Sequence, residues 1–512
     1  MSASRRQVGV TRQIPAPVGG LNARDSVASM PASDAITLDN IFPERTWVEL
    51  RKGYVAHVTA IPDPVESLLV WNGPSPKMFA AAGNEIYDVT TAGTVGSALV
   101  TGLTNARFQS VMFVNTGVTY LICVNGADGV RSYNGTTWAT QAITESGSPL
   151  AGAANFGCVT SWKKRLWFGQ NGTSKVYYLG TDAIAGDATV LDLAGVWRMG
   201  GTISAIISTS FESAGTGLSE FIGFVSSLGE IAVYRGSDPA SASTFELVGT
   251  YRLSPPVGKR FFAQMGGDLA IITSEGVLSL MQAMQIDRST AVKFAVTDKI
   301  NRLFTEAYAE FGSSFGWEAI VYPRGHRLII NVPQAGQPSI QYVMNTLSGA
   351  WCRYTGHDAL TWCLFNEELY FGGAAGTVFK ADTGTQDNGA AIPWVIRPAF
   401  NDFGTRMQKR FTLVRPLITS NGPPGVNVIM DTDYGAQPSV NVPLTISPSA
   451  VWDTAVWDVS VWAGGMEIYR PFASVGGIGY VGSIRMAGLA KGLEMQINAM
   501  DVVFEPASRL TT

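Results

Sequence analysis

Residues 221–234 read FIGFVSSLGEIAVY, in which an apolar run at Phe221–Val225 is followed by the turn Leu228-Gly229 and a second apolar run at Ile231–Tyr234. Two short apolar runs joined by a glycine-containing turn are typical of a β-hairpin. Glycine suits such turns because it readily adopts the positive φ angles that they require. The stretch decides the fold because it is one member of a regularly spaced series.

Seven hairpins of this kind run through the middle of the chain. Their turn glycines, Gly83, Gly129, Gly172, Gly229, Gly276, Gly336 and Gly376, lie 46, 43, 57, 47, 60 and 40 residues apart. A four-stranded propeller blade takes about 40–50 residues, so this spacing predicts a six- or seven-bladed β-propeller over residues 54–394. The alternative is a string of unrelated hairpins in a sandwich, which gives no reason for a nearly constant spacing.

The two longest intervals between turn glycines require insertions. In Thr297–Phe311 the apolar residues follow the i, i+3, i+4 spacing of an amphipathic helix, with Thr297 as its expected cap and Gly312 at its end. The other interval contains the Ala- and Gly-rich segment Thr181–Gly200, which we expect to form a loop or an additional hairpin.

The two ends of the chain differ from the middle. Residues 1–53 are predicted to form an N-terminal arm that packs elsewhere, with a short helical or extended piece at Ser33–Phe42. Residues 395–512 are predicted to be a separate β unit with strands at Phe411–Thr419, Gly425–Met430 and Leu493–Phe504. A β-sandwich is the natural architecture for such strands, because each sheet must cover its apolar face.

Composition restricts the class of protein. Apolar residues make up 46% of the 512 residues and charged residues only 15%, which fits either surfaces buried against neighbouring subunits or simply a β-rich chain. The net charge of −4 argues against a reader of nucleic-acid sequence, which usually carries a basic patch. We expect neither a signal peptide nor a membrane-spanning segment, because no suitable apolar run occurs.

The sequence offers no convincing chemistry, so we expect no catalytic, metal-binding or cofactor-binding residues and no enzyme activity. His326 and His357 are each expected in a solvated turn. The segment Asp431-Thr432-Asp433 lacks the further acids of a calcium loop and is expected to be a polar hairpin turn. The cysteines, Cys123, Cys158, Cys352 and Cys363, lack metal-ligand spacing and are expected to be buried, reduced thiols.

Trp452, Trp457 and Trp462 recur every five residues near the C-terminus. An odd spacing places successive side chains on opposite faces of a straight strand, so the segment must bulge, turn or bury both faces. We expect these tryptophans to pack between subunits or within the C-terminal β-sandwich. The alternative is a stacking platform for a ligand or base.

Several stretches, in chain order, are similar to the tail nozzle proteins of short-tailed bacteriophages, a family that includes the tail tubular protein B type and the packaged-DNA stabilisation proteins. The stretches are Gly19–Asn22, Leu38–Pro43, Arg51–Gly53, Tyr234–Pro239, Leu247–Tyr251, Tyr322-Pro323, Leu328–Pro333, Gly349–Trp351, and the tryptophan segment with Gly492–Pro506. They span most of the chain and are structural rather than catalytic motifs.

This resemblance implies a β-propeller flanked by a β-sandwich platform domain formed by the two termini. It implies a virion tail protein that forms a hexameric ring below the head-to-tail adaptor. Such a ring retains packaged DNA, serves as the channel for its ejection without sequence recognition, and contacts tail fibres or a spike or plug protein. The residues of a channel gate are not indicated. Residues 54–394 contain 20 basic and 26 acidic residues. This net negative charge is compatible with a channel that does not bind DNA phosphates tightly.

Two other functions stay open from the sequence. One is a propeller-type receptor- or glycan-binding tail module without catalysis. The other is a propeller glycoside hydrolase, which would need acids from several blades to converge on one cleft.

Overall fold

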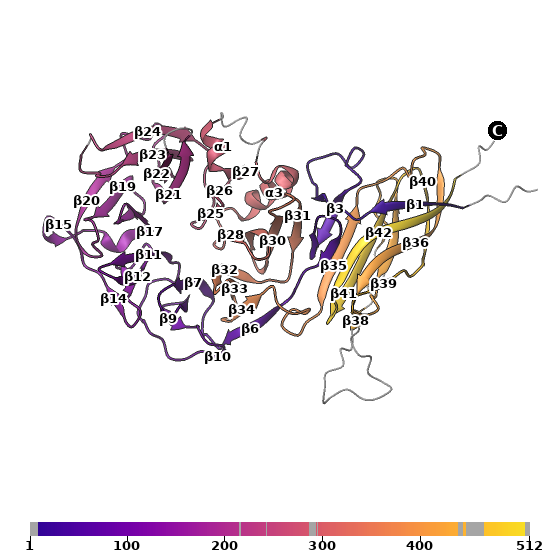
Figure 1. The fold of residues 1–512 in the computed structure, drawn as a ribbon, viewed down its shortest axis with the longest axis horizontal. Coiled ribbons are helices and arrows are strands. Elements are labelled where there is room, and N and C mark those ends of the chain that lie inside the picture. The colour runs from indigo at the N-terminus through magenta and orange to yellow at the C-terminus, as the bar shows by residue number, and fades with distance from the viewer. Residues whose placement is uncertain are drawn as a thin grey trace, which may run out of the picture.

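The protein is built almost entirely from β-strands, arranged as a ring of small sheets beside a two-layered sandwich (Figure 1). The computed structural model describes residues 9–213, 217–241, 243–285, 293, 295–438, 444–446 and 465–506. Six small sheets in the ring form the blades of a β-propeller. The fold class predicted from the spacing of the turn glycines is therefore confirmed.

Each blade is built on a meander of consecutive antiparallel strands whose first strand lies nearest the propeller axis (Figure 1). The first blade contains β7 (Val65–Trp71), β8 (Lys77–Ala82) and β9 (Glu85–Asp88), and the second β11 (Gln109–Asn115), β12 (Val118–Val124), β13 (Arg131–Tyr133) and β14 (Trp138–Thr140). The third contains β17 (Phe156–Trp162), β18 (Arg165–Gln170), β19 (Lys175–Leu179) and β20 (Gly186–Asp192), extended outward by β15 (Ile143–Glu145) and β16 (Ser148–Pro149). The fourth contains β21 (Ile203–Ser213), β22 (Gly217–Ser226), β23 (Glu230–Gly236) and β24 (Phe245–Arg252), and the fifth β25 (Phe262–Met265), β26 (Asp268–Thr273) and β27 (Gly276–Ser279).

The sixth blade closes the ring with strands from two distant parts of the chain. It contains β32 (Ala359–Phe365), β33 (Glu368–Gly373) and β34 (Val378–Ala381), which is joined by β6 (Tyr54–Thr59) and then the short β10 (Gly93–Thr94). Strand β6 pairs antiparallel with β34. This pairing covers the edge of β34, which would otherwise expose unpaired backbone groups.

A further meander, β28 (Glu318–Tyr322), β29 (Arg327–Gln334), β30 (Gln337–Asn345) and β31 (Trp351–Tyr354), fills the ring between the fifth and sixth blades. Unlike the six small sheets, this meander is one end of a ten-stranded sheet that continues into the sandwich. The link is β3 (Asp34–Asp39), which pairs parallel with β31 and antiparallel with β35 (Ile392–Pro398). We call this ten-stranded sheet the shared sheet.

Both ends of the chain form the sandwich. One layer is the far end of the shared sheet, where β35 is followed by β41 (Gly482–Lys491) and β37 (Asn427–Thr432), with β2 (Gly20–Leu21) and β38 (Leu444–Ile446) attached. The other layer has seven strands: β39 (Glu467–Tyr469), β36 (Lys409–Ser420), β42 (Met495–Pro506), β5 (Val48–Leu50), β4 (Ile41–Pro43), β1 (Val10–Pro15) and β40 (Ala473–Gly479). The segment Ser33–Phe42, left open as helical or extended, is extended.

Helices are few and short. The expected helix begins as a 3-10 turn at Asp298–Ile300 and continues as α3 (Asn301–Phe311), with Ile300 and Phe304 buried. The expected cap is wrong: the Thr297 hydroxyl accepts a hydrogen bond from the backbone N–H of Val277 at 3.0 Å and so ties the helix start to β27. Other helices within the described residues include α1 (Leu280–Gln285) and a 3-10 turn at Ala153–Asn155.

The segment Thr181–Gly200 is neither a loop throughout nor an additional hairpin. It contains β20, the fourth strand of the third blade, which pairs antiparallel with β19. Its glycines and alanines misled the prediction, because an outer blade strand needs few large side chains when most of its residues face solvent.

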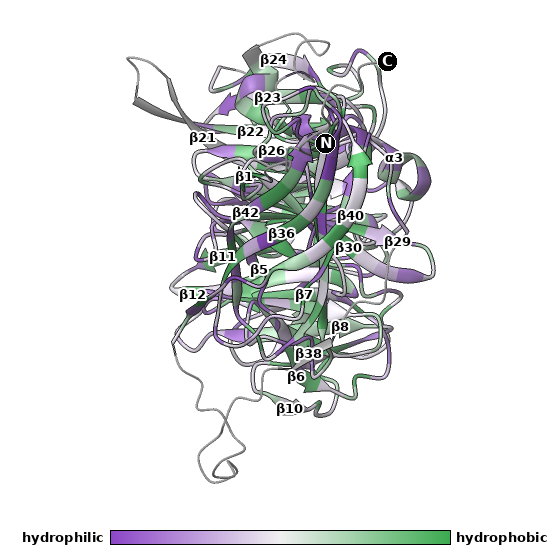
Figure 2. Cartoon of the chain, turned by 90° about the vertical axis from the view of Figure 1, so that its right-hand side faces the viewer, coloured by the Kyte–Doolittle hydropathy of each residue, from purple (hydrophilic) through white to green (hydrophobic). Residues whose placement is uncertain are grey.

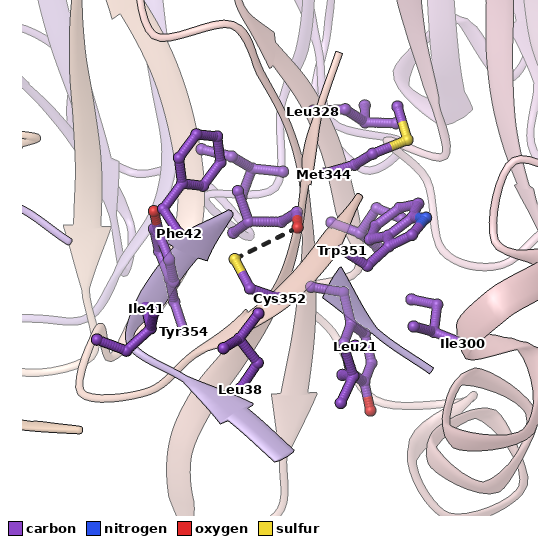
Figure 3. Close-up of a cluster of buried hydrophobic side chains, with 14 of the residues drawn as sticks. Leu21, Leu38, Ile41, Phe42, Ile300, Leu328, Met344, Trp351, Cys352 and Tyr354 are labelled. Carbon is purple, nitrogen blue, oxygen red and sulfur yellow. Dashed lines mark hydrogen bonds between the residues drawn. The ribbon is translucent and has the colours of Figure 1, made fainter. Parts of the chain in front are cut away.

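The largest hydrophobic core crosses the junction between propeller and sandwich (Figure 3). N-terminal side chains enter it beside those of the shared sheet and α3; those labelled are Leu21, Leu38, Ile41, Phe42, Ile300, Leu328, Met344, Trp351, Cys352 and Tyr354. The two parts therefore share one core and one sheet, and each helps to fix the position of the other.

Gly53 lies where the N-terminal segment enters the propeller, and its replacement by alanine is expected to destabilise the protein by about 1–3 kcal/mol. A β-carbon on Gly53 would lie 1.9 Å from the carbonyl oxygen of Gln386, so the two backbones must separate. Chemical denaturation measures the effect. The control is Gly96→Ala, because nothing lies within 4 Å of the added carbon there. Equal stability of the two variants would contradict the close approach.

Candidate functional site

The predicted site residues Trp452, Trp457 and Trp462 lie outside the described residues. Their expected packing role therefore stays a prediction. We sought a site in the remainder of the molecule, in its pockets, its buried charged groups and its exposed apolar side chains.

A pocket of about 480 Å³ opens at one end of the propeller axis. Some lining residues come from the segments that precede the innermost strand of a blade, and others come from the loops between the second and third strands of a blade. In a propeller meander, these two kinds of segment lie at the same end. The lining residues are Asn105, Arg107, Asn125, Gly126, Asn171, Gly258, Lys259, Arg260 and Gly312–Trp317. A smaller cavity of about 230 Å³ continues between the inner strands and shares Lys259 and Arg260. We call the larger cavity the axial pocket.

Arg260, directly before β25, holds the ring together beneath the axial pocket. Its guanidinium donates to the Ser67 hydroxyl and the Glu66 carbonyl of the first blade, at 2.5 and 3.0 Å. It also donates to the Phe108 carbonyl before the second blade, at 3.1 Å, and to the Thr361 hydroxyl of the sixth, at 2.9 Å. One side chain therefore connects three blades to the fifth.

The charge partner of Arg260 is Glu318 on β28, at 3.3 Å. Burial raises the pKa of the Glu318 carboxyl, and the nearby Arg260 and the backbone N–H of Trp362 oppose that rise. A buried carboxylate of this kind depends on its paired cation. We therefore interpret the Arg260–Glu318 pair as a structural ion pair that stabilises the ring, because every contact of the pair joins elements of the ring.

The outer part of the axial pocket carries two further cations. Arg107 places Nε and Nη2 on one oxygen of Glu66, at 3.1 and 3.0 Å, and its guanidinium lies 4.3 Å from the Phe315 ring centre. Within the described chain, Lys259 Nζ has no acidic partner. Desolvation in the crowded pocket lowers the pKa of Lys259, and the charges of Arg107 and Arg260 lower it further.

The candidate titrating groups from the sequence do not meet. His326 is exposed in the β28–β29 turn, as expected. His357 is not a solvated turn residue: it is buried among Tyr54, Tyr354 and Phe371. Burial, with the charges of Arg51 and Arg327, holds the pKa of His357 well below its usual value. Its turn glycine, Gly356, suggested exposure, but aromatic side chains from neighbouring strands cover it.

The acidic segment at Asp431 also differs from the expectation of a simple polar turn. Asp431, the last residue but one of β37, has its side chain fully buried between Arg397, at 2.8 Å, and Arg485, at 3.3 Å. Only Asp433 and Tyr434 have the positive φ angles of the turn. The reason is tertiary: the two arginines come from β35 and β41 in the same sheet.

Metal and thiol chemistry have little basis in the described part of the chain. No cluster of three or more His, Cys, Asp or Glu side chains that could hold a metal ion occurs among the described residues. Cys123, Cys158, Cys352 and Cys363 are free and buried, as predicted. Burial raises the pKa of the Cys158 thiol to about 12. Within the same residues, no helix is long and apolar enough to span a membrane.

A second feature is a row of exposed apolar side chains on β39, on β40 and just before β40, the two strands that pair with one edge of β36. They belong to the seven-stranded layer of the sandwich, which faces the viewer in Figure 2. Ile468 on β39 is 67% exposed, Phe472 before β40 is 60% exposed, and Ile478 on β40 is 62% exposed. Arg415 of β36 lies over the Phe472 ring and pairs with Asp501 of β42 at 2.5 Å. We call Ile468, Phe472 and Ile478 the sandwich patch.

These features define a β-propeller protein with a β-sandwich built from both termini and fused to the ring through a shared sheet. No protein-family model and no curated protein matches the sequence. Solved structures that match include BBS1N, crystallised in complex with ARL6DN, at 12% identity over 67% of this chain and 98% of that one, with a TM-score of 0.37.

Two further matches are equally distant. Raptor from Chaetomium thermophilum is 11% identical over 66% of this chain and 29% of its own, with a TM-score of 0.40. A putative 6-phosphogluconolactonase from Bacteroides fragilis is 13% identical over 66% of this chain and 92% of its own, with a TM-score of 0.37. Such similarity says nothing about what this chain binds or does.

Proposed function

We propose that this protein is a structural component of a short-tailed phage virion, a tail nozzle that assembles as a hexameric ring below the head-to-tail adaptor. In this role it retains packaged DNA and forms the channel for its ejection. Its other partners are tail fibres or a spike or plug protein, and it performs no catalysis. The resemblance of the sequence motifs to tail nozzle proteins is the origin of the proposal.

The observation that carries the proposal is the joining of propeller and sandwich by the shared sheet. The same architecture, a propeller flanked by a platform from both termini, is what the resemblance implies. The Arg353 guanidinium of β31 donates to both carboxylate oxygens of Asp39 on β3, at 2.8 and 2.7 Å, across the point where the two parts join. A rigid junction suits a ring subunit, whose contacts must recur at one fixed angle to close.

The sandwich patch also supports self-association. Its three members are large apolar side chains with more than half of their surface exposed. They are spread along one edge of β36, from Ile468 opposite Thr419 to Ile478 opposite Arg410. Large exposed apolar side chains along a sheet edge suit a surface that meets a partner. A head-to-tail ring needs such a surface on each subunit, and the low charge content of the chain is compatible with one.

Electron microscopy and mass photometry of the purified protein test the proposal. We expect particles of six times the 54.6 kDa chain mass, with six-fold symmetry and a central channel. The double variant Ile468→Asp/Ile478→Asp is expected to shift the protein to monomers, because a charge cannot be buried unpaired at low cost. Val114→Asp, on a propeller residue 58% exposed, is the matched control and should still form rings.

The ring would be contradicted if the wild-type protein were entirely monomeric at micromolar concentration, both alone and with the adaptor. Assembly that the Ile468→Asp/Ile478→Asp variant leaves intact would exclude the sandwich patch as the interface while retaining the ring itself.

A receptor- or glycan-binding tail module without catalysis is the second candidate. The observation in its favour is the axial pocket, which is open, polar and flanked by an aromatic ring at Phe315. A glycan array distinguishes the two functions. Saturable binding by a protein that stays monomeric would favour the receptor-binding module over the nozzle.

A further inference from the structure

We propose that the axial pocket binds a small molecule through a tetrahedral oxyanion, a phosphate or sulfate group, held mainly by Lys259 and Asn171. This inference does not depend on the nozzle role. It comes from the position of these two side chains relative to the glycine-lined wall of the pocket and from the lack of an acid beside Lys259.

The two donors both lie beside Gly126. A β-carbon on Gly126 would lie 2.1 Å from Asn171 Nδ2 and 3.5 Å from Lys259 Nζ. The Lys259 ammonium and the Asn171 amide are therefore close enough for one ligand group to contact both. The backbone beside them belongs to Gly126, which has no side chain. Gly157 lies beside the oxygen of the same amide: a β-carbon added to Gly157 would lie 1.8 Å from Asn171 Oδ1. The paired glycines leave room for the amide at the pocket wall.

Lys259 has two cations nearby, Arg107 and Arg260, and each of them is paired with a carboxylate of its own, Glu66 and Glu318. Among the described residues, no carboxylate forms an ion pair with Lys259 itself. A desolvated ammonium that has no counter-ion of its own is unfavourable. A bound oxyanion would remove this cost, and charge-assisted hydrogen bonds of this kind are strong.

Arg107 can provide a third hydrogen-bond donor to the oxyanion, from another side of the pocket. Glu66 occupies its Nε and Nη2, and no acceptor in the described structure lies within hydrogen-bond distance of its Nη1. Ser313 and Ser314, whose hydroxyls can donate, line the same pocket. Donors on several sides suit a tetrahedral group, whose oxygens point in several directions. Arg260 is excluded from the ligand set because the ring uses its donors.

The size of the pocket indicates more than a bare ion. Pockets that take small organic ligands are about 300–1,000 Å³, and the axial pocket is about 480 Å³. The Phe315 ring, which has the Arg107 guanidinium over it, adds apolar surface to the wall for the non-ionic part of such a ligand. We therefore assign the oxyanion to a phosphorylated or sulfated monosaccharide or a molecule of similar size.

Isothermal titration calorimetry of the full-length protein tests the site. The probes are inorganic phosphate, inorganic sulfate, and a phosphorylated and a sulfated monosaccharide, each at matched ionic strength against chloride. We expect one saturable site and tighter binding of the monosaccharide esters than of the bare ions. Lys259→Gln should weaken binding about tenfold or more, as expected for loss of a charge-assisted hydrogen bond.

The matched control is Lys164→Gln, an exposed lysine in the β17–β18 turn, outside the axial pocket. It should bind as the wild-type protein does. Asn171→Ser is a second variant and should also weaken binding without loss of the folded signal in circular dichroism. Equal affinity in wild type, Lys259→Gln and Asn171→Ser, or no binding of any probe at millimolar concentration, would overturn the proposal.

Discussion

Replacement of Arg260 by alanine is expected to lower the free energy of unfolding by about 3–5 kcal/mol, because it leaves the buried Glu318 carboxylate without its cation. The variant also loses the donors that hold Ser67 and Thr361 of two other blades. Urea denaturation followed by tryptophan fluorescence measures the change. The effect should be among the largest of any single substitution in the ring.

A matched control is Arg302→Ala on α3. Arg302 pairs with Glu306 at 3.0 Å, but both side chains are largely exposed. Exposed pairs contribute about 0–1 kcal/mol, so this variant should unfold almost as the wild type does. Adding Glu318→Gln to Arg260→Ala should restore part of the lost stability, since it removes the unpaired charge. Equal losses in Arg260→Ala and Arg302→Ala would contradict the structural role of the Arg260–Glu318 pair.

The effect of Arg260→Ala should also depend on pH. The pKa of Glu318 is raised in the folded protein, chiefly by burial, so its stabilising contribution is present at low pH and is lost as pH rises through the folded pKa. Without Arg260 this pKa should rise further. We therefore expect a smaller loss of stability at about pH 5 than at about pH 8, measured relative to wild type at each pH. A loss that is the same at both values would mean that Glu318 does not titrate with folding.

The second large effect is expected for Arg51→Ala, also about 3–5 kcal/mol, because Asp387 would lose its buried partner. The Arg51 side chain is 1% exposed and donates to both Asp387 oxygens, at 2.8 and 2.6 Å. It also donates to Asn40 Oδ1 at 2.7 Å and to the Thr355 carbonyl at 2.8 Å. Its contacts thus join the N-terminal segment to the β31–β32 connection and to the segment before β35.

Differential scanning calorimetry tests this variant. Because Arg51 lies where propeller and sandwich meet, its loss should lower the melting temperature and broaden the transition. Arg51→Lys keeps the charge but not the planar set of donors, so an intermediate loss is expected. The control Arg324→Ala breaks the Arg324–Glu368 pair, in which Arg324 is largely exposed, and should have little effect. A melting temperature unchanged in Arg51→Ala would contradict the role of this junction.

The sequence contained enough to predict the blades. Residues such as Gly229 and Gly276 have positive φ angles in the structure, and the apolar runs beside them form strands. Such turns depend on the residues within them, so they can be recognised locally. The helix at 301–311 was predictable for the same reason, but its cap was not, because Thr297 is engaged by β27.

The candidate site could not be predicted. The axial pocket gathers Arg107, Asn171, Lys259 and Phe315 from four separate parts of the chain, and none of them belongs to a recognisable motif. The sequence signal that could have drawn attention to it is the Lys259-Arg260 pair before a predicted strand. Lysine and arginine before a strand are common, however, and only their convergence at the axis gives them a distinct environment.

By itself, the sequence determined the class of fold: glycine turns at blade-length spacing, apolar runs between them, and a β-rich C-terminal unit. Tertiary structure alone decided that β6 closes the last blade, that one sheet joins the ring to the sandwich, and that His357 and Asp431 are buried. The physical reason is the distance along the sequence between the residues that interact. Turn and strand preferences arise from neighbouring residues, whereas burial and the charge around a side chain depend on segments hundreds of residues away that only the folded chain brings together.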